Sequence, residues 1–365
     1  MNTIENTPQE EHLFPCENCG ADLRFSPKTG VLTCNQCGFR EGRVEPKTTI
    51  PELDFKSALA DALPSAEIEE NRVTSCPNCG AQVGFDGENH ASECPFCATP
   101  VVVDTGSHRQ IKPSAVLPFQ LDETTAHDAM STWLGRLWFA PNGLKAYARK
   151  GRRMQGIYVP YWTFDADTKS RYRGQRGTEY QTTSTHFENG KKVQRNVTKV
   201  RWTPVSGRVS RLFDDVLVLA SKALPTRYTQ ALEPWDLSGL EPFQAFYLAG
   251  FKAEGYSIDL ENGFSFAREK MDRQILRDVK FDIGGDRQQV GAIETSVSDV
   301  TFKHILLPVW LAAYKYQGKT YRFVVNGQTG RVEGERPYSA WKIGFSVLLA
   351  LGLAAVFGYF YAQST

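Results

Sequence analysis

Two sets of four cysteines with the same internal spacing constrain the fold of this chain most strongly. In each set, two CxxC pairs are separated by 14 residues. The sets are Cys16, Cys19, Cys34 and Cys37, and Cys76, Cys79, Cys94 and Cys97. Four thiolates held in two tight turns supply the tetrahedral sulfur site that a structural Zn²⁺ prefers, although iron also binds S4 sites. The spacing therefore predicts two zinc ribbons, each with one structural zinc ion, with iron as the chemical alternative.

The use of cysteine favours metal binding over disulfide bonds. All 8 cysteines of the chain belong to the two sets, so no odd thiol is left over. The first residues contain no basic region followed by an apolar run, so we expect no secretory signal. Zinc thiolates persist in a reducing compartment, whereas disulfides need an oxidising one. Because four cysteines close each shell, we expect His90, which lies inside the second set, to be exposed rather than a ligand.

Composition divides the chain into five parts. We expect ribbon 1 at 1–45, a linker with one short helix at 46–71, ribbon 2 at 72–104, a large module at 105–338 and an apolar helix at 341–362. Each ribbon is too small to bury a core of its own, so zinc would supply most of its folding free energy. The large module is long enough for one or two packed cores.

An internal repeat is visible in the large module. Val159–Trp162 reads VPYW and Leu307–Trp310 reads LPVW, and each is preceded by a short apolar strand pattern and a stretch with helical apolar spacing. The predicted fold class is therefore α+β, with a duplicated β-rich module divided at about 105–225 and 226–338. We expect Trp162 and Trp310 to be core anchors of their repeats rather than ligand platforms.

The C-terminal segment has the length and composition of a transmembrane helix. Residues 343–362 are 20 residues without a charged side chain, enough to cross the hydrocarbon core of a bilayer. Basic residues (Arg331, Arg336 and Lys342) precede this segment and none follows it. The positive-inside rule then predicts a single-pass, tail-anchored protein of the bacterial inner (cytoplasmic) membrane with its N-terminal bulk in the cytoplasm.

Small residues recur every fourth position along the same segment. They are Ser346, Ala350, Ala354, Gly358 and Ala362. Such a stripe lets helices approach closely in lipid, so it predicts a homo-oligomer formed through the transmembrane helix, with ordinary small residues of an apolar helix as the alternative.

Positive charge is concentrated in one part of the chain. Residues 145–211 contain 16 Lys or Arg and 4 Asp or Glu, a local charge of +12 in a chain whose net charge is +1. Three interpretations stay open: a solvated hairpin face, a surface for anionic headgroups or an acidic partner protein, and a nucleic-acid surface.

No catalytic motif stands out. Residues 313–320 fit a relaxed A-x4-G-K-T string, but a phosphate-binding loop needs a glycine-rich turn before a helix, and Tyr321–Val325 has the pattern of a strand. We therefore expect a hairpin turn at Gly318–Lys319. We identify no catalytic or cofactor-binding residue and expect a protein that is not an enzyme; an unrecognised site in the 105–338 module is the third class of function left open.

Three segments and the C-terminal helix resemble a known family. The segments are Leu306–Trp310, Val325–Gly330 and Gly334–Ser339. The chain resembles, over nearly its whole length, a bacterial family of zinc-ribbon proteins with a C-terminal membrane anchor, often labelled primosomal replication helicase-like or transcription-factor-IIB-type zinc ribbon proteins. The sequence contains no helicase core to support the first label. The resemblance implies proximity to SPFH-domain (flotillin-like) membrane scaffolds, and hence a protein partner.

Two classes of function compete on this sequence. The favoured one is a non-enzymatic, membrane-anchored zinc-binding adaptor or scaffold that engages a protein partner on the cytoplasmic face. The alternative is a membrane-tethered nucleic-acid-binding zinc-ribbon protein. Ribbon 2 has no Lys or Arg between Cys76 and Cys97 and carries three acidic residues, Asp86, Glu88 and Glu93. Because phosphate binding depends on Lys and Arg, this acidic ribbon argues against nucleic acid.

Overall fold

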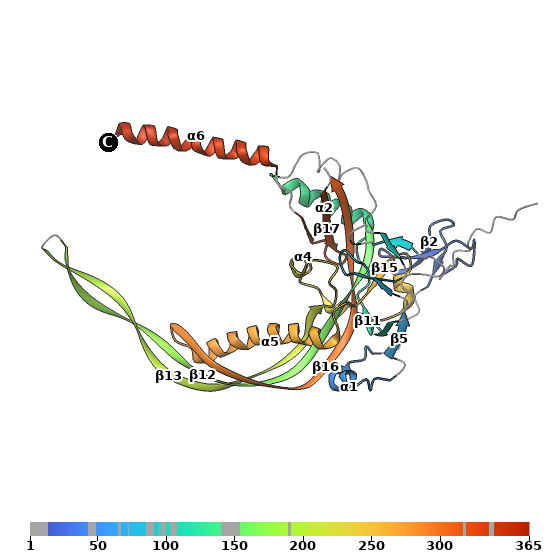
Figure 1. Cartoon of the computed structure of the whole chain (residues 1–365), viewed down its shortest axis with the longest axis horizontal. Helices are drawn as coiled ribbons and strands as arrows, with labels where there is room; N and C mark the ends of the chain where they lie inside the picture. The colour runs from blue at the N-terminus through green and yellow to red at the C-terminus, as the bar shows by residue number, and fades with distance from the viewer. Residues whose placement is uncertain are drawn as a thin grey trace, which may run out of the picture.

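The structure is a computed structural model that describes most of the chain. The described residues are 14–42, 49–64, 67–71, 73–84, 91–94, 96, 100–102, 108–139, 154–188, 191–316, 319–335 and 339–364. The predictions for Cys97 and His90 concern residues outside these ranges. The described part is a mixed α/β structure with a β-rich body and one apolar C-terminal helix (Figure 1).

The first cysteine set lies on a small antiparallel sheet, as the sequence predicts for a ribbon. Its strands are β1 (Leu23–Ser26), β2 (Val31–Cys34) and β3 (Arg40–Glu41). The second set is surrounded by short strands: β6 (Val73–Ser75), β7 (Gln82–Gly84), β8 (Ala91–Glu93) and β9 (Pro100–Val102). Between the sets lie β4 (Leu53–Asp54), the short helix α1 (Phe55–Leu59) and β5 (Ile68–Asn71), which pairs with β10 (His108–Ile111).

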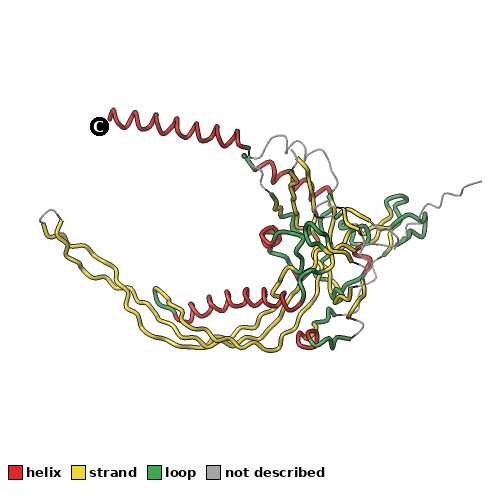
Figure 2. Tube along the Cα trace, viewed as in Figure 1, coloured by secondary structure: helices red, strands yellow, loops and turns green. Residues whose placement is uncertain are grey.

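Three very long antiparallel strands dominate the body. They are β12 (Gln155–Glu188), β13 (Lys191–Leu219) and β16 (Arg287–Tyr316), with β12 in the centre. The strands leave the body together as a curved arm, and α5 (Leu260–Ile283) lies along its concave side (Figures 1 and 2). Residues at helical spacing on α5, including Ala267, Met271, Ile275 and Val279, are buried against the sheet, which is why this helix follows the arm.

The two similar segments of the sequence face each other in this sheet. Val159 of β12 pairs with Leu307 of β16, and Pro160 pairs with Leu306 as Tyr158 pairs with Pro308. Pro160 is equivalent to Pro308, and Tyr158 is equivalent to Leu306, so the second and third pairs are related by exchange of the two strands. The pairing of β12 with β16 therefore has an approximate twofold symmetry, whose axis passes between Val159 and Leu307.

Neighbouring elements follow the same symmetry. β11 (Ala115–Val116) runs parallel to β16, and β15 (Lys252–Gly255) runs parallel to β12. The helix α2 (Glu123–Arg136) precedes β12 as α5 precedes β16, and each begins after an aspartate, Asp122 or Asp259, whose side chain accepts a hydrogen bond from the backbone three residues on. The helical stretches predicted from the sequence are thus confirmed.

The two halves diverge after their tryptophans. β12 continues for many residues into the arm and turns back as β13, whereas β16 ends at Tyr316 and pairs with the shorter β17 (Lys319–Asn326), which in turn pairs with β18 (Val332–Gly334). β17 is a strand antiparallel to β16, so the expected hairpin in place of a phosphate-binding loop is confirmed. Of the two expected turn residues, Lys319 is the first residue of β17, whereas Gly318 lies outside the described ranges, as does Asn189–Gly190 of the longer hairpin.

Short elements connect β13 to α5. They are α4 (Thr226–Ala231), η2 (Leu237–Gly239), β14 (Glu241–Pro242), which pairs with β11, and η3 (Ala245–Leu248). Trp162 and Trp310 are 0% and 6% exposed, so the prediction that both are core anchors is confirmed.

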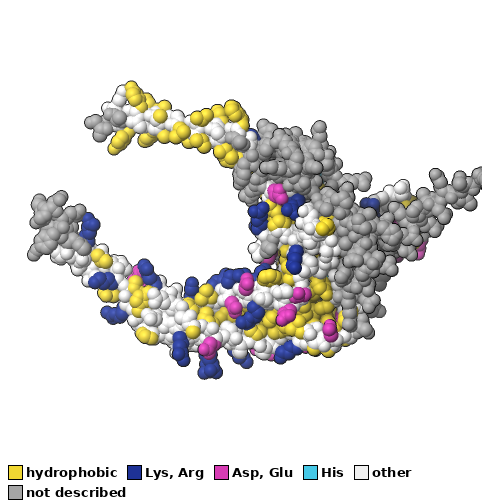
Figure 3. Space-filling view, viewed as in Figure 1, with side chains coloured by type: hydrophobic (Ala, Val, Ile, Leu, Met, Phe, Trp, Pro, Cys, Tyr) yellow, Lys and Arg dark blue, Asp and Glu magenta, His cyan; other side chains and the backbone are white. Residues whose placement is uncertain are grey.

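The last element is α6 (Ala340–Ser364). Its stretch from Trp341 to Tyr361 is long and apolar enough to cross a membrane, and none of that stretch is buried against the rest of the described chain. In Figure 3, α6 is covered with hydrophobic side chains and projects away from the body. An apolar helix without a packing partner is unstable in water, so this finding favours a membrane anchor.

Candidate metal centres and an adjoining cavity

The four cysteines of the first set converge on one point. Their sulfur atoms all lie within 4.8 Å of one another, and the Sγ atoms of Cys16 and Cys37, and of Cys19 and Cys34, are 3.5 Å apart. A tetrahedron of sulfurs about 2.3 Å from a central zinc ion has edges of roughly 3.8 Å. The spacing of the donors therefore fits a zinc ion, which would be bound by all four side chains.

Tight turns after the CxxC pairs produce this convergence. The N–H of Gly20 donates to the carbonyl of Cys16 at 2.8 Å, and Gly38 and Gly80 repeat the bond to Cys34 and Cys76. All three glycines have φ near +74°, a left-handed conformation in which a side chain is strained. Each of these glycines directly follows the second cysteine of a pair, where the backbone turns around the metal position.

The electrostatics of the first set show why a cation suits it. A hydrogen bond from the backbone N–H of Phe39 lowers the pKa of Cys37 to about 6. The N–H of Ala21 acts in the same direction on Cys19, but the neighbouring thiols outweigh it and raise the pKa of Cys19 to about 12. Crowded thiols cannot all ionise beside one another, whereas a divalent cation stabilises four thiolates together.

The second set has the same geometry as far as the structure describes it. Cys76, Cys79 and Cys94 lie within 4.8 Å of one another, and the Sγ atoms of Cys79 and Cys94 are 3.6 Å apart. Cys97, the fourth predicted ligand, is outside the described residues. Cys76 and Cys94 are buried, as are Cys16 and Cys34 of the first set. Both cysteine clusters can bind a metal ion and are compatible with zinc.

Ribbon 1 is joined to the body through an aromatic contact and an ion pair. Phe25 stacks edge-on against Tyr247 at 5.4 Å, and its backbone N–H donates to the carbonyl of Ala249. Lys28 lies 2.5 Å from Asp122, the residue that caps α2. A hydrogen bond from Lys28, with one from Thr125, lowers the pKa of Asp122 to about 2. The buried cysteines of this ribbon belong to the same apolar cluster as Tyr158 and Trp310, so metal binding would also stabilise the ribbon–body interface.

Ribbon 2 is joined to the body through the main sheet. Its strand β7 pairs with β15, placing Val83 opposite Glu254. Glu254 is 3% exposed, and its Oε1 accepts a 2.7 Å hydrogen bond from the hydroxyl of Ser221. Burial raises the pKa of Glu254 to about 8. No sequence pattern indicated this buried carboxyl, because a lone glutamate in a polar segment has no distinguishing neighbours.

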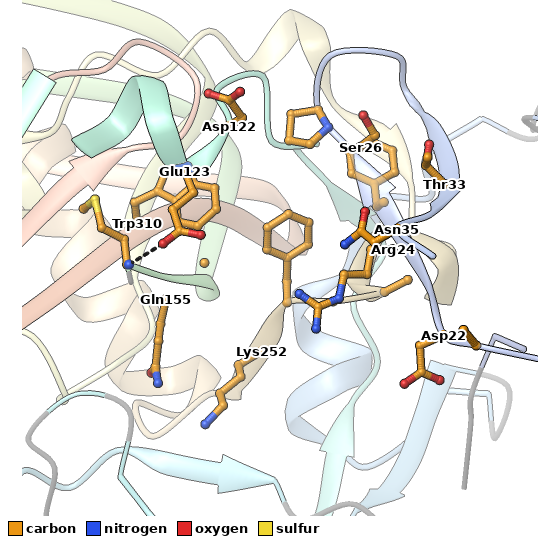
Figure 4. A pocket seen from close by; sticks show the side chains of 18 of the residues that line it. Asp22, Arg24, Ser26, Thr33, Asn35, Asp122, Glu123, Gln155, Lys252 and Trp310 are labelled. Carbon is orange, nitrogen blue, oxygen red and sulfur yellow. Dashed lines mark hydrogen bonds between the residues drawn. The ribbon is translucent and has the colours of Figure 1, made fainter. Parts of the chain in front are cut away.

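A cavity of about 880 Å³ opens between ribbon 1 and the body. In Figure 4, Glu123 and Trp310 lie at one end, while Arg24, Asn35 and Thr33 of the ribbon lie at the other. The Oε1 atom of Glu123 accepts a 2.8 Å hydrogen bond from the backbone N–H of Met154, so this carboxylate helps to hold the start of β12. Side chains of both charges with an aromatic floor suit a small polar ligand, and no spacing in the sequence predicted the site because its walls come from distant segments.

A group of three aspartates on the arm is explained without a metal. The carboxylates of Asp165, Asp214 and Asp215 lie close together. The ammonium group of Lys303 is 2.9 Å from Asp215 and 3.5 Å from Asp165, and it also pairs with Glu52 at 3.0 Å. Lys303 therefore supplies positive charge to Asp165 and Asp215, two of the three aspartates.

Comparison with known proteins gives one informative similarity. The chain is similar to the uncharacterized protein YdjG of Bacillus subtilis (strain 168), with 28% identity over 339 residues, covering 90% of this chain and 91% of that protein. No family model matches the chain, and no solved structure matches it. The similarity to YdjG extends over most of both chains.

Proposed function

We propose that this protein is a non-enzymatic adaptor, anchored by α6 in the bacterial cytoplasmic membrane, that engages a protein partner on the cytoplasmic face. The observation that carries the proposal is the combination of an apolar helix that packs against no described part of the chain and a body that contains its own buried core. In this proposal, two zinc ions hold the ribbons against the body and take no part in a reaction.

The closed cysteine clusters support a structural role for the metal. A catalytic zinc keeps one position for water or substrate, whereas four thiolates fill a tetrahedral shell. In the first cluster all four donors are protein sulfurs. Rigid ribbons and long strand edges are surfaces that proteins commonly recognise, and β13 pairs only with β12 among the described strands. An SPFH-type membrane scaffold, implied by the family resemblance, is the first candidate partner.

Charge asymmetry around α6 supports the orientation. Lys342 lies at the start of α6, and no Lys or Arg follows it in the chain. The proposal therefore places residues 1 to about 340 in the cytoplasm. Protease added to intact spheroplasts should leave the ribbons intact and should digest them after lysis; digestion in intact spheroplasts would reverse the orientation.

Affinity purification from gently solubilised membranes, with and without nuclease, tests the adaptor role. We expect a protein partner that survives nuclease treatment and is retained at moderate salt. A matched sample of the Cys16→Ser/Cys76→Ser variant controls for non-specific capture, because it should keep α6 in the membrane and lose the partner. Copurifying nucleic acid that is released by salt would overturn the adaptor in favour of the nucleic-acid-binding alternative.

A further inference from the structure

The outer part of the arm consists, among the described strands, of β12 and β13 alone. The pairing of β16 with β12 ends where Gly177 faces Arg287, and α5 ends at Ile283. Beyond this point β12 and β13 continue to pair, from Thr178 opposite Arg201 to Glu188 opposite Lys191. We call residues 178–188 and 191–201 the arm ribbon. Figure 2 shows it extending past the end of α5.

The register fixes which side chains share a face of the arm ribbon. Tyr172 and Arg176 of β12 point towards α5, since the hydroxyl of Tyr172 donates to Asp282 at 2.5 Å and the guanidinium of Arg176 donates to the carbonyl of Ile283. β12 and β13 pair without a register shift from Ala166 onwards. Side chains alternate along a strand, so Thr178, Tyr180, Thr182 and Ser184 continue the α5 side of the sheet.

Among the described side chains of the arm ribbon, the Lys and Arg residues gather on that face. Tyr180 pairs with Lys199, and the neighbouring pairs bring Arg201 and Arg195 onto the same side. Among the described side chains of the arm ribbon, at 178–185 and 194–201, this side carries no Asp or Glu. The guanidinium of Arg201 lies 5.4 Å from the centre of the Tyr180 ring. We call this side, defined by Tyr180, Arg195, Lys199 and Arg201, the basic face.

The opposite side of the arm ribbon has a different composition. It carries Glu179, which pairs with Arg287 at 2.6 Å, together with uncharged residues such as Gln181, Thr183 and Asn196. Further towards the body, the same side carries Lys169, Arg171 and Arg173, but there Arg171 lies opposite Glu294 in the register and Asp167 is close by. Charge is thus mixed on the convex side and of one sign on the basic face.

We propose that the basic face lies on the anionic phospholipid surface of the membrane into which α6 inserts; this inference rests on the membrane anchoring proposed above. Lipid headgroups and nucleic acids both offer phosphates to Lys and Arg. The apolar helix α6 favours the lipid, because insertion of α6 holds the arm close to a surface of phospholipid headgroups. The attraction to an anionic leaflet grows with each basic residue that lies near its surface. Tyrosine favours the interface between lipid and water, which suits Tyr180.

The arm can contact the membrane only at its surface. The polar backbone of a two-stranded ribbon cannot enter hydrocarbon, because its open edges would leave hydrogen-bonding groups unsatisfied. The arm must therefore lie along the membrane surface while α6 crosses the bilayer. On insertion, the arm and α6 diverge more than they do in Figure 1, where both project from the same side of the body.

Hydrogen exchange on the full-length protein in nanodiscs tests the proposal. Two kinds of nanodisc are compared, one of phosphatidylcholine alone and one of equal parts phosphatidylcholine and phosphatidylglycerol. We expect amide exchange in residues 178–201 to slow by on the order of tenfold in the anionic nanodiscs, and the effect to disappear at high salt, which screens the charges. Elution of the protein with either nanodisc reports the anchor separately, so failure of the anchor and failure of the arm contact give different results.

Two variants with the same change of charge sharpen the test. R195Q/K199Q/R201Q removes three positive charges from the basic face, and K169Q/R171Q/R173Q removes three exposed positive charges from the convex side. The first variant should lose the slowed exchange and the second should keep it. Equal exchange in the two lipid compositions, or loss of the effect in the second variant only, would overturn the proposal. Protection by an added oligonucleotide in phosphatidylcholine nanodiscs, without protection by phosphatidylglycerol, would replace it with a nucleic-acid surface.

Discussion

Val159 and Leu307 are equivalent residues of two similar sequence segments, and they lie directly opposite each other in the pairing of β12 with β16. Because equivalent residues of the two halves lie opposite each other in this pairing, the two halves of the duplication pack against each other about a twofold axis. The tryptophans then form matching bonds across the symmetry: the indole N–H of Trp162 donates to the carbonyl of Ile258 at 3.0 Å, and that of Trp310 donates to the carbonyl of Leu121 at 2.9 Å. Each half thus holds the residue before the helix cap of the other half.

Substitution of either tryptophan tests this exchange. Trp162→Phe and Trp310→Phe each keep an aromatic ring but leave a carbonyl without its donor, so we expect each to lower the free energy of unfolding by about 1–3 kcal/mol. The two sites are about 20 Å apart along β12, judged from a rise of about 3.3 Å per residue, so their effects should add in the double variant. Chemical denaturation in detergent measures the free energy of unfolding of the two single variants and of the double variant. A double variant no less stable than either single variant would contradict two independent sites.

His304 predicts a dependence of stability on acid. Burial lowers the pKa of His304 to about 4, and its Nδ1 atom lies 2.8 Å from the carbonyl of Ile111. In the unfolded chain the imidazole of His304 binds a proton near pH 6.5, whereas in the folded chain it stays neutral until the pH approaches 4. The contribution of His304 to the free energy of unfolding should therefore be fully present above about pH 6.5 and should be lost as the pH falls towards 4. The full loss is on the order of 3 kcal/mol.

The variant His304→Asn isolates this contribution. Asparagine can still donate to the Ile111 carbonyl but does not titrate, so the difference in unfolding free energy between wild type and variant should shrink as the pH falls from 7 to 4. Measurement at pH 8, where the histidine is neutral in both states, gives the cost of the substitution itself. A difference that stays constant over this range would show that His304 is not the titrating group.

Lys303 holds three carboxylates together at the base of the arm. Its side chain is 9% exposed and pairs with Glu52, Asp165 and Asp215. Lys303→Met should lower the unfolding free energy by roughly 2–4 kcal/mol, because it leaves partly buried carboxylates without a cation. Burial raises the pKa of Asp165, so Asp165→Asn in the same background should recover part of the loss. A double-mutant cycle measures the coupling; a coupling of zero would contradict the ion-pair explanation.

The metal content of the purified protein tests the cysteine clusters. Eight thiolates in two closed S4 sites predict two zinc ions per chain, and Cys16→Ser or Cys76→Ser should each reduce the content to one. Because zinc supplies most of the folding free energy of a ribbon, the Cys76 variant should unfold ribbon 2 and leave α6 inserted. Elemental analysis and protease sensitivity measure these outcomes. Well under two equivalents of zinc, or iron with visible absorption, would contradict the assignment.

Local features of this protein followed from its sequence. The CxxC spacing indicated the turns that bring the sulfurs together. Helical apolar spacing before each of the two similar segments predicted α2 and α5, and the uncharged run at 343–362 predicted α6. These features depend on a few neighbouring residues, because turn geometry, helix periodicity and bilayer-spanning length are properties of short segments.

Only the tertiary structure decided how the segments meet. The basic residues at 145–211 left three interpretations open because alternation along one strand cannot say which side a helix covers; the position of α5 and the register of β12 with β13 assign Arg195, Lys199 and Arg201 to one side. The cavity beside Arg24 and Glu123, the buried carboxyl of Glu254 and the Lys303 cluster all join residues far apart in sequence. The sequence by itself determined the cysteine turns and the helices α2, α5 and α6. The long-range strand register and the docking of the ribbons determined which charged side chains are buried, paired or exposed, because burial depends on neighbours that local sequence patterns do not specify.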